Sequence, residues 1–317
     1  MDTLDRNKLL ANIAVWVALA AMPYWLPAIG GYTELGTRVV ILGLAAMSLN
    51  FLLGYTGVLS FGHAAYFGLG AYGAGLMLRY LYPSTGLAII FGVLIGTSAA
   101  AIIGPMIIRL RGVYFAMVTI AFGQVFYFIA FRWHSVTGGD DGLTGWGRLP
   151  IDLGFTTLDI QGNSRLFYFF VLAIFAIAVA VMAWVLRSPF GHTLIAIREN
   201  ERRARFLGIP IDRHIWMSWT ISCAFVSLAG ALYALLNNFV DPRALYWAQS
   251  GDFVIMAVLG GMRSFWGPFG AAIFVVLQDY LSSQTENWMS FVGMFFVLIV
   301  LFFPRGVLGA LKRKATS

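Results

Sequence analysis

Ten apolar runs, most of them about twenty residues long, constrain the fold of this chain more than any other feature. They lie at about 9–30, 36–53, 57–80, 86–108, 113–131, 166–186, 214–237, 250–262, 266–282 and 288–304. About 20 residues of α-helix cross the lipid core of a bilayer. The runs are continuous and do not alternate apolar with polar residues, so they favour helices over a β-barrel. We therefore predict an all-α polytopic membrane protein with about ten transmembrane helices, forming a single transmembrane domain over residues 1–317.

Composition excludes other classes. Only 11% of the residues are charged and 60% are hydrophobic, so the formal charge of +7 belongs to a chain embedded in a lipid bilayer and does not indicate nucleic-acid binding. The only cysteine is Cys223, which rules out an intramolecular disulfide. The N-terminus lacks an Ala-x-Ala cleavage site, so we interpret it as a first transmembrane helix and not as a removable signal.

Basic residues predict the orientation of the spans, because Arg and Lys collect in cytoplasmic loops. They cluster at 109–111, 187–213 and 305–314, and even numbers of spans separate these clusters. Counting back four spans from Arg109 places Arg6 and Lys8 on the same side of the membrane. We therefore expect a multi-pass protein with cytoplasmic N- and C-termini. Segment 250–282 is interrupted by glycines and a proline, so a re-entrant hairpin is an alternative there that leaves the parity unchanged.

The window 187–213 is the most charged part of the chain, with six arginines, two glutamates and one aspartate. The pattern predicts one helix over 191–207, supported by the pairs Glu199–Arg203 and Glu201–Arg205 at i,i+4 spacing. Gly208 is placed to end this helix. An amphipathic helix on the lipid surface is the alternative, although this stretch has no Trp anchor.

The long loop 132–165 then faces outside. Its segment TGGDDGLTGW is rich in turn-forming residues and carries Asp140 and Asp141. Two interpretations remain open. The loop is either a flexible connector or a docking surface for an extracytoplasmic partner, with the two aspartates at its tip.

Glycines interrupt two of the apolar runs. Stretch 54–75 contains seven glycines, which fit either close helix packing or a broken helix beside a pathway. Segment 250–262 is interrupted similarly, and Ser60-Phe61 and Ser264-Phe265 lie at corresponding places. Paired broken segments favour two inverted five-helix halves with a central site.

Polar side chains within apolar runs are candidates for a substrate pathway, because they are costly in lipid. We select Ser60, Phe61, His63, Thr119 and Gln124. Hydrogen bonding between helices is an equally ordinary role for them, and a neutral His63 bonded to a neighbouring helix is one such interpretation.

The chain lacks the chemistry of an enzyme. Its only lysines, Lys8, Lys312 and Lys314, lie near the chain ends, so there is no P-loop for ATP. Neither a Cys/His cluster nor an HExxH motif is present, and we expect no metal or cofactor in this chain. Intramembrane carboxylates that would bind a coupling ion are few. Energy is therefore expected to arrive through a partner protein.

Several motifs together resemble the permeases of branched-chain amino acid ABC importers, and the M-type more than the H-type. The first is G-x-x-L-x-A-I-R-E-N from Gly191, followed by Ala204, Gly208 and Ile209. The others are SLNFLLGYTGVLSFGHAAYFGLGAY at 48–72, RLRGVYFAMVTIAFGQ at 109–124, TGGDDGL at 137–143, AVLGGMRSFWGPFGAA at 257–272 and FFPRGVLG at 302–309. The family has small or apolar residues where this chain has Arg202 and Arg203.

The resemblance implies that the window 187–213 is a cytoplasmic coupling loop. Its coupling helix would contact a separate ATPase through Gly191, Ala196, Ile197, Arg198, Glu199, Asn200, Ala204 and Gly208. It also implies a second, H-type permease chain, two ATP-binding subunits that hold ATP and Mg²⁺, and a periplasmic amino acid-binding protein docking on the periplasmic loop 132–165. The bacterial inner membrane is the implied location. Alternatives are a urea or short-amide ABC permease, an ion-driven secondary transporter and a passive channel.

Overall fold

Helices make up nearly all of the secondary structure in the computed structural model, which describes residues 3–28, 30–147, 150–152, 157–158, 163–261 and 268–302. Ten α-helices coincide with the ten apolar runs: α1 Thr3–Ala28, α2 Thr33–Thr56, α3 His63–Leu76, α4 Thr85–Ile107, α5 Val113–Arg132, α7 Ser164–Arg187, α10 Ile211–Asn237, α11 Trp247–Gly260, α12 Pro268–Gln284 and α13 Trp288–Phe302. The short elements between them are η1 Met77–Leu81, α6 His134–Thr137, η2 Gly139–Asp141, β1 Ile151–Asp152, β2 Thr157–Leu158, α8 Pro189–Glu199, α9 Glu201–Phe206 and η3 Pro242–Leu245.

The helices differ in length. Among the described residues, α2, α4, α5, α7 and α10 are long and apolar enough to cross a membrane. By contrast, α3 and α11 have 14 residues each, or about 21 Å, which is shorter than a bilayer core of about 30 Å. The all-α polytopic class is confirmed, and the two glycine-interrupted runs form the shortest of the ten helices.

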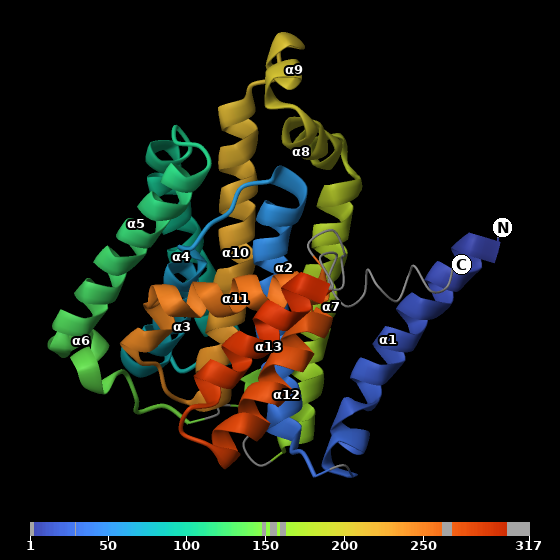
Figure 1. The fold of residues 1–317 in the computed structure, drawn as a ribbon. Helices are drawn as coiled ribbons and strands as arrows, with labels where there is room; N and C mark the ends of the chain where they lie inside the picture. The colour runs from blue at the N-terminus through green and yellow to red at the C-terminus, as the bar shows by residue number, and fades with distance from the viewer. Residues whose placement is uncertain are drawn as a thin grey trace.

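Helices α2 and α10 form the centre of the protein and run in opposite directions (Figure 1). α2 is buried on nearly all sides, as expected of a helix that is apolar all round. α10 packs against α3 and α4, whereas α2 packs against α11 and α12. α10 therefore contacts α3, the short helix that follows α2 in the sequence, and α2 contacts α11, the short helix that follows α10.

Corresponding helices in the two halves of the chain run in opposite directions. In Figure 1, α4 runs opposite to α12, and α5 runs opposite to α13. Segments outside any α-helix lead into both short helices, 57–62 into α3 and 238–246 into α11. This arrangement agrees with the predicted inverted halves. Ser264-Phe265, which suggested the correspondence, lies outside the described residues.

Glycines bring α3 and α10 into backbone contact. A Cβ at Gly70 would lie 2.1 Å from the Ser227 carbonyl oxygen, and one at Gly230 would lie 1.8 Å from that of Phe67. Neither position has room for a side chain. The glycine-rich stretch thus provides close packing, one of the two roles expected of it.

The polar elements lie at the two ends of the long helices. α8 and α9 project beyond α7 and α10 at one end, which we call the α8–α9 end (Figure 1). α6 and η2 lie toward the other end, which we call the opposite end. The described first part of loop 132–165 and the window 187–213 are therefore on opposite sides of the helical bundle.

Candidate functional site

The charged window forms two helices and not the single helix predicted over 191–207. α8 ends at Glu199, and the Asn200 side chain accepts a hydrogen bond from the Arg203 amide at 2.9 Å, which caps α9. Because the chain bends at Asn200, Glu199 and Arg203 are no longer on one helix, so this predicted pair is wrong. Glu201 and Arg205 do form their pair, at 3.1 Å.

Two glycines lie near the two ends of the α8–α9 segment. Gly191 sits against the preceding turn, where a Cβ would lie 2.2 Å from the Leu186 carbonyl oxygen. Gly208 has φ +80°, and the Ile209 amide bonds back to the Ala204 carbonyl at 3.2 Å, ending α9 as predicted. These glycines set the angle at which α8–α9 leaves the two spans.

One face of α8–α9 packs on the bundle. Leu194, Ile197 and Ala204 are buried, and α8 contacts both α2 and α10. A single helix over 191–207 would bring Leu207 to the same face as Ile197. The bend at Asn200 instead turns Leu207 outward and leaves it 75% exposed.

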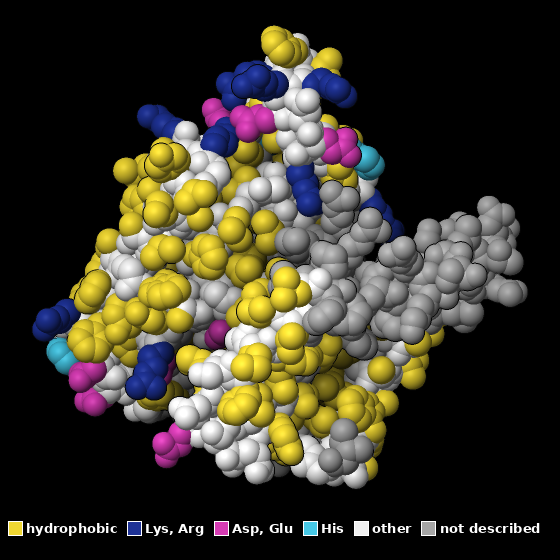
Figure 2. Space-filling view, in the orientation of Figure 1, with side chains coloured by type: hydrophobic (Ala, Val, Ile, Leu, Met, Phe, Trp, Pro, Cys, Tyr) yellow, Lys and Arg dark blue, Asp and Glu magenta, His cyan; other side chains and the backbone are white. Residues whose placement is uncertain are grey.

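The outer face is a tip of mixed apolar and basic character, which we define as Ile195, Arg202, Arg203, Phe206 and Leu207. All five side chains are exposed, and Phe206 is 91% exposed. Figure 2 shows hydrophobic side chains at the outermost point with basic ones just below. Arg202 and Arg203 thus belong to the surface that projects from the bundle.

Arg198 points inward instead. Its guanidinium donates a hydrogen bond to the Gly54 carbonyl near the end of α2, and its stem packs over Gly57, where a Cβ would meet Arg198 Cγ at 3.0 Å. Gly57 has φ +78° and ends α2. Arg198 therefore ties α8 to the point where the chain leaves α2 and turns toward α3.

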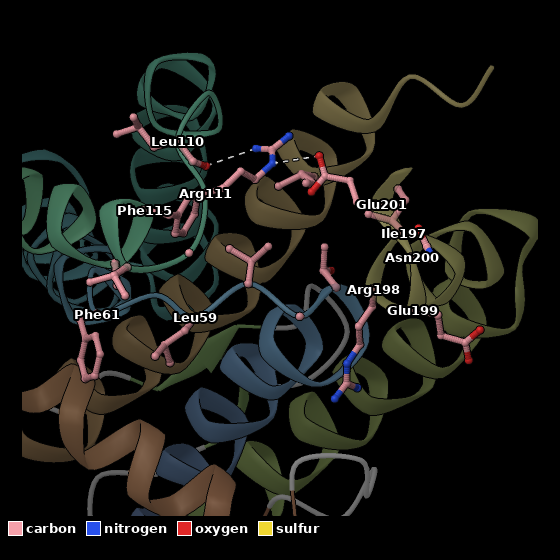
Figure 3. A pocket seen from close by; sticks show the side chains of 17 residues that line it. Leu59, Phe61, Leu110, Arg111, Phe115, Ile197, Arg198, Glu199, Asn200 and Glu201 are labelled. Carbon is pink, nitrogen blue, oxygen red and sulfur yellow. Dashed lines mark hydrogen bonds and ion pairs between the residues drawn. The ribbon is translucent and has the colours of Figure 1, made fainter. Parts of the chain in front are cut away.

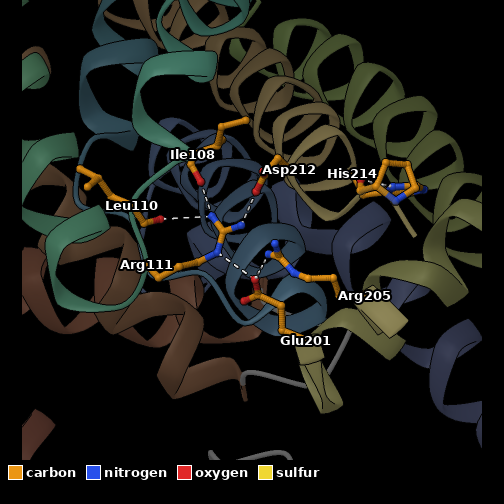
Figure 4. Close-up of polar contacts among 8 residues, drawn as sticks. Ile108, Leu110, Arg111, Glu201, Arg205, Asp212 and His214 are labelled. Atoms are coloured by element: carbon orange, nitrogen blue, oxygen red, sulfur yellow. Dashed lines mark hydrogen bonds and ion pairs between the residues drawn. The ribbon is translucent and has the colours of Figure 1, made fainter. Parts of the chain in front are cut away.

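A second contact that connects α9 to the helical bundle was not predicted from the sequence. Arg111, in the α4–α5 loop, bonds to Glu201 at 3.3 Å and also pairs with Asp212 at the start of α10 (Figure 4). It donates to the carbonyl of Ile108 as well. Arg111 was visible as a basic residue beside a span, but its partners lie about a hundred residues away, and nothing local identifies them.

A cavity of about 570 Å³ lies between these ties. Its lining comes from 56–59, Phe61, 110–113, Phe115, Ala116, 197–201 and Ile215. Figure 3 shows Arg111, Arg198 and Phe61 around this space, which brings one predicted pathway residue beside predicted coupling residues. The cavity is large enough for a small organic molecule.

The predicted pathway residue His63 is the centre of a buried hydrogen-bond cluster. Its Nε2 lies 2.8 Å from the Ser222 hydroxyl, and its Nδ1 lies 3.0 Å from the Ser60 hydroxyl. Ser222 donates to the Ser48 carbonyl, so its oxygen accepts from Nε2–H, and Nδ1 accepts from Ser60. This assigns a neutral imidazole with both nitrogens satisfied. The ring also meets Trp219 edge-on at 5.4 Å.

The other pathway candidates lie around the start of α3. Thr119 is buried, and its hydroxyl accepts from the Phe61 amide at 3.2 Å, which holds 57–62 against α5. Gln124 has a buried Nε2 without a partner among the described residues. The Ser250 hydroxyl accepts from the Ala64 amide at 2.8 Å and so joins α11 to α3. A pathway role for Thr119 and Gln124 stays a prediction.

The aspartates predicted to dock a partner are exposed at the opposite end. Asp140 and Asp141 form η2, and Asp140 lies 3.7 Å from His134. The segment is held in place, because Leu143 and Val240 exchange backbone hydrogen bonds of 2.7 and 3.1 Å. This part of the loop therefore has a defined shape, and a docking role for Asp140 and Asp141 stays a prediction.

These features define the class, a polytopic α-helical membrane protein with an extramembrane tip tied to its core. Residues 31–303 match the family described as "branched-chain amino acid transport system / permease component". The chain belongs to that family, which is one of transporter permease components.

Individual relatives agree. The chain is 27% identical, over 93% of its length and 74% of the relative's, to the high-affinity branched-chain amino acid transport system permease protein LivM of Escherichia coli (strain K12). Identity to LivH of the same organism is 29%, over 43% of this chain and 44% of the relative. A probable LivM of Methanocaldococcus jannaschii is 23% identical over 84% of this chain and 89% of the relative. No solved structure matches. The predicted resemblance to the M-type permease is confirmed.

Proposed function

We propose that this chain is the transmembrane permease subunit of an ABC importer, moving branched-chain or other hydrophobic amino acids inward with energy from ATP hydrolysis in a separate subunit. The observation that carries the coupling role is the exposed tip. Phe206 and Leu207 extend beyond the spans at 91% and 75% exposure. Exposed apolar side chains rimmed by charges are typical of a protein contact.

Two side-chain contacts behind the tip can transmit a displacement of the tip to the helical bundle. Arg198 connects α8 with the end of α2, and the Glu201–Arg111 pair connects α9 with the α4–α5 loop. Closure of two ATP-binding subunits would push the tips and rock these helices about the central α2 and α10. Gly191, Ala196, Ile197, Asn200, Ala204 and Gly208 shape this loop in our proposal, and Glu199 remains an exposed contact.

The partners follow from this assignment. They are an H-type permease chain, two ATP-binding subunits that hold ATP and Mg²⁺, and a periplasmic amino acid-binding protein that meets Asp140 and Asp141. The α8–α9 end is then cytoplasmic in the inner membrane, with the N- and C-termini on that side. No cofactor is assigned to this chain.

A tip variant tests the coupling role. Phe206→Asp should weaken co-purification of the ATP-binding subunits about tenfold or more. An aromatic side chain that becomes buried at the interface contributes much of the binding energy of such a contact. Phe206→Leu keeps an apolar side chain and should retain them. Glu199→Ala should also weaken the complex, whereas Glu286→Ala, exposed beyond α12, should not. Full ATP-dependent uptake by Phe206→Asp would contradict the proposal.

Reconstitution separates the alternatives. With all partners present, L-leucine uptake should require ATP and the binding protein. Uptake by the single chain under an ion gradient would indicate a secondary transporter, and uptake that persists without ATP would indicate a channel. Transport of urea but not L-leucine would identify a urea or short-amide permease.

A further inference from the structure

A second, smaller cavity lies where the two inverted halves meet. Residues from α2, α3, α10, α11 and α12 line it, and its volume is about 30 Å³. Arg38, on the second turn of α2, faces it from one half, and Asp252, on α11, faces it from the other. Gln249 and Gln278 complete a polar lining enclosed between the helices.

The two opposite charges in this cavity are not bonded to each other. They interact electrostatically, yet no salt bridge joins Arg38 and Asp252 in the described part of the chain. The Arg38 Nε atom is buried without a hydrogen-bond partner there. A charge at membrane depth is costly and is usually paired or part of a transport path. The arrangement leaves capacity for a ligand that carries both charges.

Apolar side chains supply the remaining walls. Phe67 and Met256 line the cavity beside the charged groups, and Phe67 packs on Phe253 with ring centroids 5.3 Å apart. A guanidinium, a carboxylate, two amides and an apolar wall together complement a zwitterionic amino acid with an aliphatic side chain. An uncharged amide such as urea would use neither charge.

The His63 cluster differs in this respect. Both ring nitrogens of His63 are bonded within the protein, so binding a ligand would break existing bonds. Arg38 Nε has no bond to lose among the described residues. Arg38 and Asp252 are therefore better placed to bind a passing solute.

We propose that Arg38 and Asp252 form the transit site for the amino acid. Arg38 binds its α-carboxylate, Asp252 binds its α-ammonium group, and Phe67 and Met256 contact its side chain. This inference rests on the proposed function and adds the residues that bind the substrate. In the present state the cavity has room for about two water molecules, so the amino acid enters when α11 and α12 separate from α2.

Charge-neutralising variants in the complete reconstituted transporter test the site. Arg38→Gln and Asp252→Asn should each reduce L-leucine uptake about tenfold or more, the loss expected for one charged hydrogen bond. ATP hydrolysis stimulated by the loaded binding protein should persist. The controls Arg165→Gln, exposed at the start of α7, and Glu286→Gln, exposed beyond α12, should transport normally.

The outcomes separate this inference from the proposed function. If the unaltered transporter shows no ATP-dependent L-leucine uptake, the proposed function fails. If it does, and Arg38→Gln and Asp252→Asn transport equally well, only the transit site fails.

If the charge variants do not assemble into a transporter, protection of an introduced cysteine against chemical labelling tests the transit site instead. The native Cys223 is the chain's one cysteine and is buried, so Gln249→Cys adds the one accessible thiol of this chain, at the cavity, and labelling is read on this chain. During ATP turnover, saturating L-leucine should slow the labelling of this introduced thiol by a small methanethiosulfonate reagent. Gln284→Cys, exposed at the end of α12, should be labelled at the same rate with and without L-leucine. Equal labelling of the Gln249→Cys variant under both conditions would overturn the proposal.

Discussion

The Arg111 guanidinium lies 3.3 Å from the Glu201 carboxylate, across 90 residues of sequence. The contact joins the loop between α4 and α5 to the first turn of α9. The same guanidinium pairs with Asp212 on α10. One side chain therefore connects the projecting tip to three of the long helices.

Removing that side chain should loosen the connection while leaving the tip in place. For Arg111→Ala we expect a loss of about 0.5–2 kcal/mol in coupling, or roughly 2- to 30-fold in L-leucine transported per ATP hydrolysed. Arg109→Ala removes an exposed charge two residues away and serves as the control. A transport-to-hydrolysis ratio equal to wild type in Arg111→Ala would refute the role.

The helix break at Asn200 should depend on its side-chain oxygen. Asn200→Ala removes the cap of α9 and should destabilise that helix by about 1 kcal/mol. Faster amide hydrogen exchange over 201–206 would report this loss. Asn200→Asp keeps an acceptor and should exchange as slowly as wild type, and equal exchange in all three proteins would argue against the cap.

The backbone contact between α3 and α10 should not tolerate a methyl group. Because a Cβ at position 230 would lie 1.8 Å from the Phe67 carbonyl oxygen, Gly230→Ala should cost about 1–3 kcal/mol through forced separation of the helices. Gly86→Ala, where no atom lies within 4 Å of the new Cβ, is the control. The measurement is the fraction of detergent-solubilised protein that survives heating, and equal survival would contradict the packing.

His63→Ala distinguishes a structural role from a pathway role. Loss of the ring leaves Ser60 and Ser222 without this partner in the core and should cost about 1–3 kcal/mol of stability. Ser282→Ala, at an exposed hydroxyl on α12, should have no effect. A changed KM for L-leucine with unaltered thermal stability would instead place His63 in the pathway.

Local pattern determined much of the fold. Apolar runs of about twenty residues can satisfy their backbone in lipid only as helices, so all ten were located correctly. Gly208 was identified as the end of α9, because a left-handed residue after a helix favours glycine. The family was recognisable from short motifs.

Other features were decided only by tertiary structure. The bend at Asn200 arises because its side chain caps α9 while Leu194 and Ala204 pack on the bundle, and helical periodicity alone does not contain that competition. The Arg111–Glu201 and Arg38–Asp252 relationships join residues 90 and 214 positions apart. Such pairs depend on how the inverted halves pack, and packing brings together side chains that sequence spacing leaves unrelated.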